Sequence, residues 1–215
     1  AKVDAVRAGE ATFTEEELLG QRLFTAAGKG RCAVCHRGSP PTGPSPLFSD
    51  FGYDNLGVPK NPLNPFLLDN PGWVDPGLGG FLETLETTVP EYAALADANF
   101  GKHKVPTTRN VALGSCEAAA PGEPCVEKAY MHNGYFTTLK QVVHFYNTRD
   151  VKDRCEDLGI YDATVDVAMA NDCWPAPEVE ANLNTTLLGN LGLTDAEEDA
   201  LVALMKAMSD GYWVK

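Results

Sequence analysis

The sequence predicts one all-α domain over residues 1–215, with long loops between its helices. Two segments, 14–26 and 194–209, combine a helix-capping signal with apolar side chains at helical spacing. A third segment, 138–147, repeats this spacing. The chain also contains 20 glycines and 15 prolines, and this composition favours long connections between a modest set of helices.

The first helix is expected over residues 14–26. Thr14 is followed three positions later by Glu17, which is the pattern of a capping box. Glycine inside a helix lowers its stability. The presence of Gly20 here therefore indicates a close approach of another helix.

Three further helices follow in chain order. A short one is expected over 90–98, because proline suits a first helical position. The helix at 138–147 places four side chains on one apolar face: Leu139, Val142, Val143 and Tyr146. His144 lies on the opposite face of that helix, where we expect it to meet solvent. The last helix, 194–209, begins with a second capping box at Thr194.

Three stretches, 38–81, 114–128 and 150–178, are expected to be loop insertions. The first is rich in proline, glycine and asparagine and shows no sustained period. It also contains many aromatic and aliphatic residues, which disordered segments lack. We therefore expect an ordered loop that wraps around the helices.

The charge balance bears on the choice of partner. The chain has 17 Lys and Arg against 30 Asp and Glu, a formal net charge of -13. A nucleic-acid-binding protein needs a basic face, so that class is not expected. An acidic chain instead favours a protein partner with a basic or neutral docking face. No apolar run approaches the roughly 20 residues of a membrane-spanning helix, so none is expected.

Cys32, Cys35 and His36 form a C-x-x-C-H motif, the attachment signature of c-type haem. Two thiols at this spacing suit the two vinyl groups of one porphyrin, and the adjacent imidazole suits the iron. A thioredoxin-like dithiol is an alternative, but a motif of that kind would lie near a βαβ pattern and would need no histidine. A zinc site is another, but it needs two more closely spaced ligands. The motif therefore predicts one covalently bound haem c with His36 as an iron ligand.

Four other cysteines stand in two local pairs. The simplest of the three possible pairings joins Cys116 to Cys125 and Cys155 to Cys173. Free buried thiols are the alternative. Disulfides and covalent haem attachment both indicate an oxidising compartment, periplasmic or extracellular.

The order of these features resembles the class I cytochrome c fold, with a first helix, the C-x-x-C-H motif and a final amphipathic helix. Four further strings resemble bacterial dihaem cytochrome c peroxidases and MauG-type enzymes. They are residues 48–59 (FSDFGYDNLGVP), 104–113 (KVPTTRNVAL), 129–134 (AYMHNG) and 144–150 (HFYNTRD). The resemblance covers most of 13–150 and the last helix.

Two departures from that family stand out. Its members carry two haems in two domains, whereas this chain has one C-x-x-C-H motif and resembles only the C-terminal half. In the peroxidases that half holds the electron-transferring haem. Few residues precede the first expected helix, which predicts a single haem domain. The insertion at 114–128 separates two motifs that usually lie closer together.

A second axial ligand must come from a remaining methionine, histidine or tyrosine. The candidates are Met131, His132, His144, Tyr146, Met169, Met205, Met208 and His103. The apolar face of the 138–147 helix turns Tyr146 toward the core. The resemblance aligns this position with the methionine ligand of the peroxidase electron-transfer haem and with the tyrosine ligand of a MauG-type haem. It therefore implies Tyr146 as the ligand, with Met131 as the alternative; a simply packed aromatic is the structural interpretation.

Other site residues follow from the same motifs. Lys104 and Arg109 can pair with haem propionates, or they are surface cations. The resemblance places His132 beside the haem, whereas an ordinary loop histidine is equally compatible with the sequence. No catalytic residue is assigned.

Three functions stay open. Electron transfer by a monohaem cytochrome is the first, because the chain resembles the electron-transferring half. A haem peroxidase or MauG-like oxidising enzyme, acting with a partner haem protein, is the alternative, because a phenolate ligand favours ferric or higher oxidation states. A haem-bearing subunit of a larger complex is the third.

Overall fold

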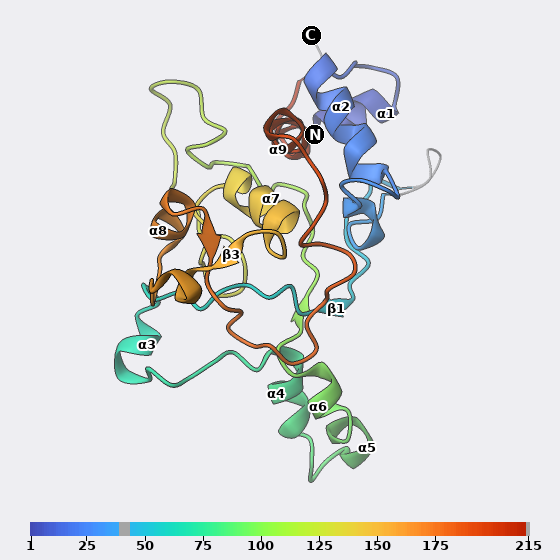
Figure 1. Cartoon of the computed structure of the whole chain (residues 1–215). Helices are drawn as coiled ribbons and strands as arrows, with labels where there is room; N and C mark the ends of the chain where they lie inside the picture. Colours follow the sequence, from blue (N-terminus) through green and yellow to red (C-terminus); the bar gives the residue numbers. More distant parts are fainter. Residues whose placement is uncertain (39–43, 214–215) are drawn as a thin grey trace.

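A computed structural model describes residues 1–38 and 44–213. Within them, three helices pack together as the main structural unit. They are α2 (Glu15–Thr25), α7 (Leu139–Thr148) and α9 (Asp195–Ala207). α2 packs along α9, and α7 contacts α9 as well (Figure 1). These are the places where the sequence predicts the main helices. We call the three together the helical core.

Each core helix begins at a threonine that caps it. The threonine side chain accepts a hydrogen bond from a backbone N–H three residues later, and the side chain there accepts one from the threonine backbone. The pairs are Thr14 with Glu17, Thr138 with Gln141, and Thr194 with Glu197. A capping box satisfies N–H groups that the helix leaves unpaired, so it defines where each helix starts.

Gly20 lies where α2 meets α9, as its position inside a helix indicated. A Cβ atom on Gly20 would stand 2.0 Å from the carbonyl oxygen of Ala200. Because backbone cannot move aside as a side-chain tip can, only glycine permits this separation.

An aromatic cluster fills the core below α7. Phe145 packs against Phe136 with ring centroids 5.1 Å apart and edge-on against Trp174 at 5.2 Å. The indole N–H of Trp174 donates to the Thr148 hydroxyl at 2.9 Å. These rings are fully buried, so they connect α7 to the distant segment that carries Trp174 through both apolar area and ring geometry.

Short elements lie inside two of the stretches expected to be loops, and one short strand, at 103–104, lies outside them. β1 (Tyr53–Asp54) pairs antiparallel with β2 (His103–Lys104), and β3 (Asp153–Arg154) pairs parallel with β4 (Cys173–Trp174). The 150–178 stretch also contains η2 (Cys155–Leu158) and α8 (Val165–Ala170). Strands of two residues show no periodicity in a sequence. Positions 39–43 of the first expected loop lie outside the described residues.

The remaining helices are short. They are α1 (Lys2–Arg7), η1 (Cys32–Val34), α3 (Phe66–Asp69), α4 (Gly77–Glu83), α5 (Pro90–Ala93) and α6 (Ala96–Asn99). A short helix begins at Pro90 as predicted, but the predicted extent to 98 is wrong, because the chain leaves helical geometry at Leu95 and a second helix follows. This break lets α6 pack against α4, where a Cβ on Gly79 would stand 2.5 Å from Phe100 Cα.

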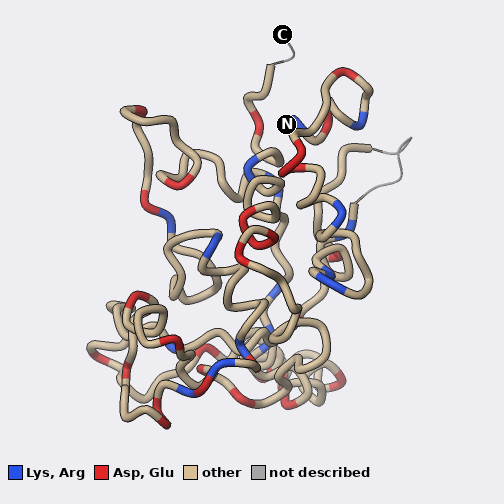
Figure 2. The backbone as a smooth tube through the Cα atoms, turned by 45° about the horizontal axis from the view of Figure 1, so that its top comes forward, with Lys and Arg blue, Asp and Glu red and all other residues tan. Residues whose placement is uncertain are grey.

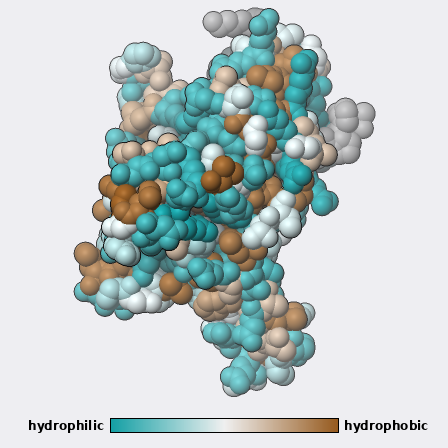
Figure 3. Space-filling model, viewed as in Figure 1, coloured by the Kyte–Doolittle hydropathy of each residue, from teal (hydrophilic) through white to brown (hydrophobic). Residues whose placement is uncertain are grey.

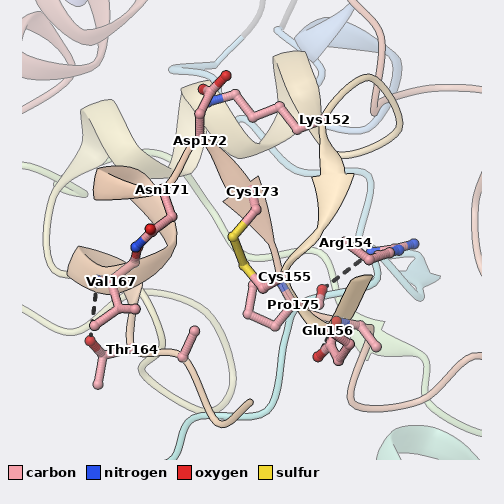
Figure 4. Close-up of a disulfide and its surroundings, with 12 residues drawn as sticks. Lys152, Arg154, Cys155, Glu156, Thr164, Val167, Asn171, Asp172, Cys173 and Pro175 are labelled. Carbon is pink, nitrogen blue, oxygen red and sulfur yellow. Dashed lines mark hydrogen bonds and ion pairs between the residues drawn. A yellow bond between two sulfur atoms is a disulfide. The ribbon is translucent and has the colours of Figure 1, made fainter. Parts of the chain in front are cut away.

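Both predicted disulfides are confirmed. Cys116 bonds Cys125 within the 114–128 stretch, and Cys155 bonds Cys173. Figure 4 shows the second one joining the start of η2 to β4. Each closes a short loop, and such a covalent link restrains the unfolded chain.

The acidic excess is spread along the chain. Figure 2 shows Asp and Glu distributed over most segments, with fewer Lys and Arg between them. Apolar side chains gather over α3 in the view of Figure 3, where Leu63, Phe66 and Leu68 are more than half exposed. Within the described ranges, no helix combines the length and apolar character that crossing a bilayer requires.

Candidate functional site

A cavity of about 580 Å³ lies beside the helical core. Its volume falls within the range of small-molecule and cofactor sites. The C-x-x-C-H segment, β2 with the residues after it, residues 129–132, α7 and α9 all contribute to its wall. Five of the eight candidate axial ligands line it: His103, Met131, His132, Tyr146 and Met205.

The two motif thiols reach this cavity from one turn of chain. Cys32 begins η1, and the His36 N–H donates to its carbonyl oxygen at 2.8 Å. This turn brings Cys32 and Cys35 to the cavity wall as free, half-buried thiols. Burial raises the pKa of Cys32 to about 12 and also raises the pKa of Cys35. Reactive dithiols have lowered pKa values, so the thioredoxin-like interpretation loses support.

The zinc interpretation also lacks support from the geometry. Residues 1–38 and 44–213 contain one cluster of His, Cys, Asp and Glu side chains close enough together to hold an ion. It consists of Asp75, His103 and His132 and includes neither motif thiol. The motif thiols would thus lack the closely spaced partners that structural zinc needs.

His36 presents one ring nitrogen to the site. Its Nδ1 lies 3.0 Å from the carbonyl oxygen of Phe48. A carbonyl only accepts, so Nδ1 carries the proton and Nε2 keeps its lone pair. Burial lowers the pKa of His36, which favours the neutral imidazole. A neutral ring oriented through its second nitrogen is the form that binds iron or another metal.

Tyr146 reaches the cavity from α7. All four residues of the predicted apolar face line the cavity wall, including Tyr146. Its hydroxyl makes no hydrogen bond to another described residue. Burial raises the pKa of Tyr146, and the nearby thiols of Cys32 and Cys35 raise it further. Tyr146 is therefore an oxygen donor on the cavity wall, near enough to both thiols for them to affect its pKa.

Met131 is the other candidate from this wall. It lies in the turn after Tyr130 with φ of 69°, a conformation that non-glycine residues rarely adopt. Two of the remaining methionines lie elsewhere: Met169 is partly exposed on α8, and the Met208 sulfur accepts from the Thr108 hydroxyl at 3.2 Å.

The expectation that His144 meets solvent is wrong. Its side chain is only 20% exposed, and its Nδ1 lies 2.9 Å from a carboxylate oxygen of Glu198. Lys152 Nζ lies 2.7 Å from the other ring nitrogen. The position opposite the cavity face is covered by α9 and by the 150–178 segment, which the helical period of α7 alone does not reveal.

The three proposed haem-edge residues have different surroundings. Lys104 is exposed at the cavity wall, with Nζ 4.8 Å from the Phe51 ring centroid. His132 also lines the cavity. Arg109 does not: its guanidinium donates to both carboxylate oxygens of Asp4, at 2.6–2.9 Å. The structure therefore uses Arg109 to attach α1 to the body of the molecule, at a sequence separation that no local motif indicates.

Sequence reasoning missed two carboxylates next to the cavity residues. Glu178 lies 2.9 Å from His132 Nε2, and Asp75 lies in the cluster with His103 and His132. Burial raises the pKa of Glu178, but hydrogen bonds from His132, the Asp75 N–H and Asn133 outweigh it and leave that pKa below its usual value. Neither acid stands in a motif, so no sequence signal singles it out.

Comparisons with known proteins agree with the resemblance found in the motifs. The chain is 30% identical to the methylamine utilization protein MauG of Paracoccus denitrificans, across 98% of this chain and 46% of that protein. It is 33% identical to cytochrome-c peroxidase IdrP2 of Denitromonas iodatirespirans, across 68% of this chain and 36% of that protein. No family model matches the sequence.

Solved structures give the same picture. The diheme peroxidase BthA of Burkholderia thailandensis aligns with a TM-score of 0.67 and 29% identity, over 98% of this chain and 46% of that one. A MauG-like protein associated with microbial copper homeostasis aligns with a TM-score of 0.58 at 20% identity and so shares the fold. The chain thus spans less than half the length of each of these proteins.

Proposed function

Because the chain is related to MauG and to dihaem cytochrome c peroxidases over almost its whole length, we propose that it carries haem c. Cys32 and Cys35 would attach it and His36 would be an axial ligand. One observation carries the proposal: two free thiols, an imidazole oriented by Phe48 and the Tyr146 side chain all line one cavity.

The donor set fits this group. Each thiol would add across one vinyl group, its sulfur bonding one carbon while its hydrogen goes to the other. The mainly apolar walls from α7 and α9 suit a porphyrin face and exclude water. When bound, the haem iron would supply one-electron redox chemistry. The Phe48 carbonyl would keep the His36 ring in one tautomer and orientation.

Tyr146 is the proposed second axial ligand, with Met131 as the alternative. The place of Tyr146 on the cavity wall and its closeness to both thiols support this choice. To bind as a phenolate, Tyr146 must lose a proton that burial otherwise retains, and a ferric ion would provide the compensating charge. Lys104, exposed at the cavity wall, is the proposed propionate partner.

The proposed role is electron transfer in the periplasm or outside the cell. Two disulfides together with a covalently attached haem support that location. The net charge of -13 supports a redox partner with a basic or neutral docking face. A haem peroxidase or MauG-like oxidising enzyme, acting with a partner haem protein, is the second candidate, and the oxygen donor at position 146 favours it.

Intact mass tests the attachment. Protein expressed with a haem-attachment system should carry the mass of one haem after denaturation, and the Cys32→Ser/Cys35→Ser variant should have the mass of the bare chain. Cys116→Ser/Cys125→Ser is the matched control, since it also removes two sulfurs but should keep the haem. A wild-type protein with the bare-chain mass would overturn the proposal.

Spectroscopy tests the ligand and separates the two roles. Tyr146→Phe should change the ferric optical and EPR spectra, whereas Met131→Leu should not; the reverse result would assign Met131. A ferric spectrum that neither cyanide nor peroxide alters supports electron transfer. High-spin iron that responds to both supports the enzyme.

A further inference from the structure

Two histidines and an aspartate meet at the edge of the cavity. We call Asp75, His103 and His132 the rim cluster. One potential ligand atom from each lies within 4.8 Å of the other two. The imidazoles of His103 and His132 are stacked almost in parallel, with ring centroids 3.7 Å apart and planes 6° apart. The ligand atoms of two imidazoles and one carboxylate therefore lie close together without any contribution from the C-x-x-C-H motif, and one imidazole would turn out of the stack for both nitrogens to face one ion.

Backbone hydrogen bonds bring Asp75 beside His103. The Leu78 N–H donates to the Lys102 carbonyl at 2.8 Å, and the Gly101 N–H donates to the Pro76 carbonyl at 2.9 Å. A Cβ on Gly77, whose φ is +56°, would stand 2.3 Å from the Lys102 carbonyl oxygen. The two segments are thus held together by main chain and by glycine, so the pairing of Asp75 with His103 is part of the fold.

Glu178 organises the other half of the cluster. One of its oxygens accepts from His132 Nε2 and from Asn133 Nδ2, both at 2.9 Å. The other accepts from the Asp75 N–H at 3.2 Å. The Glu178 side chain is only 4% exposed. A buried carboxylate that holds the outer nitrogen of a histidine fixes its tautomer and leaves the second nitrogen as a donor, as happens around metal-binding histidines.

The Asp75 carboxylate uses one oxygen locally. Its Oδ1 accepts from the Gly77 N–H at 2.9 Å in a local turn, and no other described residue donates to the second oxygen, which is where a ligand would bind. Two carboxylates and two imidazoles give the cluster an excess of negative charge when the rings are neutral. In the part of the chain that the structure describes, His132 is the one basic group within ion-pair distance of Glu178. A cation would balance this charge.

We propose that the rim cluster binds one divalent transition-metal ion, of the zinc and copper class. Imidazole nitrogen suits these ions, and one carboxylate completes a donor set of two nitrogens and one oxygen. Three protein ligands leave a further position for water or another small ligand. Asp75, His103 and His132 are the ligands, and Glu178 is a positioning residue.

Calorimetric titration of chelator-treated protein with Zn²⁺ tests the site. We expect one ion per chain. Asp75→Asn keeps the hydrogen bond to Gly77 but removes the charge, and His103→Phe keeps a stacked ring but removes the donor. Each should weaken Zn²⁺ binding more than about tenfold. Asp69→Asn, at an exposed aspartate elsewhere, is the control and should bind as the wild type does. Binding that is absent, or unchanged in both cluster variants, would overturn the proposal.

The motif thiols are also good zinc ligands when they carry no haem, so the titration is repeated with Cys32→Ala/Cys35→Ala. If this double variant binds one ion, and the further change His103→Phe abolishes that binding, the rim site is supported even if the haem proposal fails. Should that variant not fold, EPR of the wild-type protein with one equivalent of Cu²⁺ replaces it. Splitting from two imidazole nitrogens supports the rim site, and a thiolate-ligated spectrum would overturn it.

Discussion

The helical core and the rim of the cavity use their polar side chains differently. In the core, Glu198 is 2% exposed and its oxygens lie close to His144, Asn147 and Lys140, so its charge is locally compensated. At the rim, Glu178 is almost as buried, but its one basic neighbour among the described residues is His132, whose ring stacks on another imidazole. The comparison indicates that the core network supports stability, whereas the rim network keeps a charge available for a ligand.

The largest effect is expected from Glu198→Ala. The change leaves His144 and Asn147 without their shared acceptor, and breaking a buried network of this kind costs about 3 kcal/mol of unfolding free energy. Urea denaturation measures it. The neighbouring Asp199, whose side chain is 51% exposed, is the control, since Asp199→Ala should cost less than about 1 kcal/mol. Equal losses in the two variants would remove the contrast between buried and exposed acids of α9.

Gly20→Ala should cost about 2 kcal/mol, because the added methyl group would collide with the Ala200 carbonyl and separate α2 from α9. Thermal unfolding should show a clear fall in Tm. Gly28→Ala adds the same atom where nothing lies within 4 Å, so it should leave Tm nearly unchanged. If Gly20→Ala leaves Tm unchanged, α2 and α9 tolerate a wider separation than their geometry indicates.

Acid should destabilise the protein through both networks. Burial raises the pKa of Glu198, but hydrogen bonds from His144 and Asn147 outweigh it, so its pKa in the folded state lies below the usual 4.5. The pKa of Glu178 is also lowered, because hydrogen bonds to its carboxylate outweigh the effect of burial. A depressed pKa stabilises the fold above the unfolded value, and this contribution is lost as pH falls through the folded one. Unfolding free energy should therefore drop below about pH 4.5.

Two variants separate these contributions. Glu198→Gln and Glu178→Gln should each flatten the dependence of unfolding free energy on pH below 4.5. Glu198→Gln should also lower stability at neutral pH, whereas Glu178→Gln should chiefly alter metal binding. If Glu178→Gln destabilises the protein at pH 7 as much as Glu198→Gln does, the rim is structural in the same way as the core.

The smallest effect is expected from Arg109→Ala, at about 1 kcal/mol, because its paired carboxylate Asp4 is partly exposed. Limited proteolysis should show earlier release of α1. The haem content should not change, since Arg109 does not line the cavity. A loss of haem in this variant would instead support the original prediction that Arg109 contacts a propionate.

Much of the helical core could be predicted because its signals are local. Thr14 with Glu17 and Thr194 with Glu197 each lie within one helical turn, and hydrogen-bond geometry translates that spacing directly into a helix start. The first-turn proline correctly predicted where α5 begins, but the helix expected over 90–98 is divided at Leu95, where α6 turns to pack against α4 at Gly79.

The sequence alone determined the two disulfides and the face of α7 that carries Tyr146, and it predicted the haem attachment at Cys32, Cys35 and His36 that we propose. In each case the residues concerned are near one another along the chain, so their sequence spacing constrains how they lie in space. Only the tertiary structure decided the burial of His144, the partner of Arg109 and the assembly of the rim cluster. Asp75 and Glu178 are 103 residues apart, and their meeting depends on how several loops pack, which no local pattern contains.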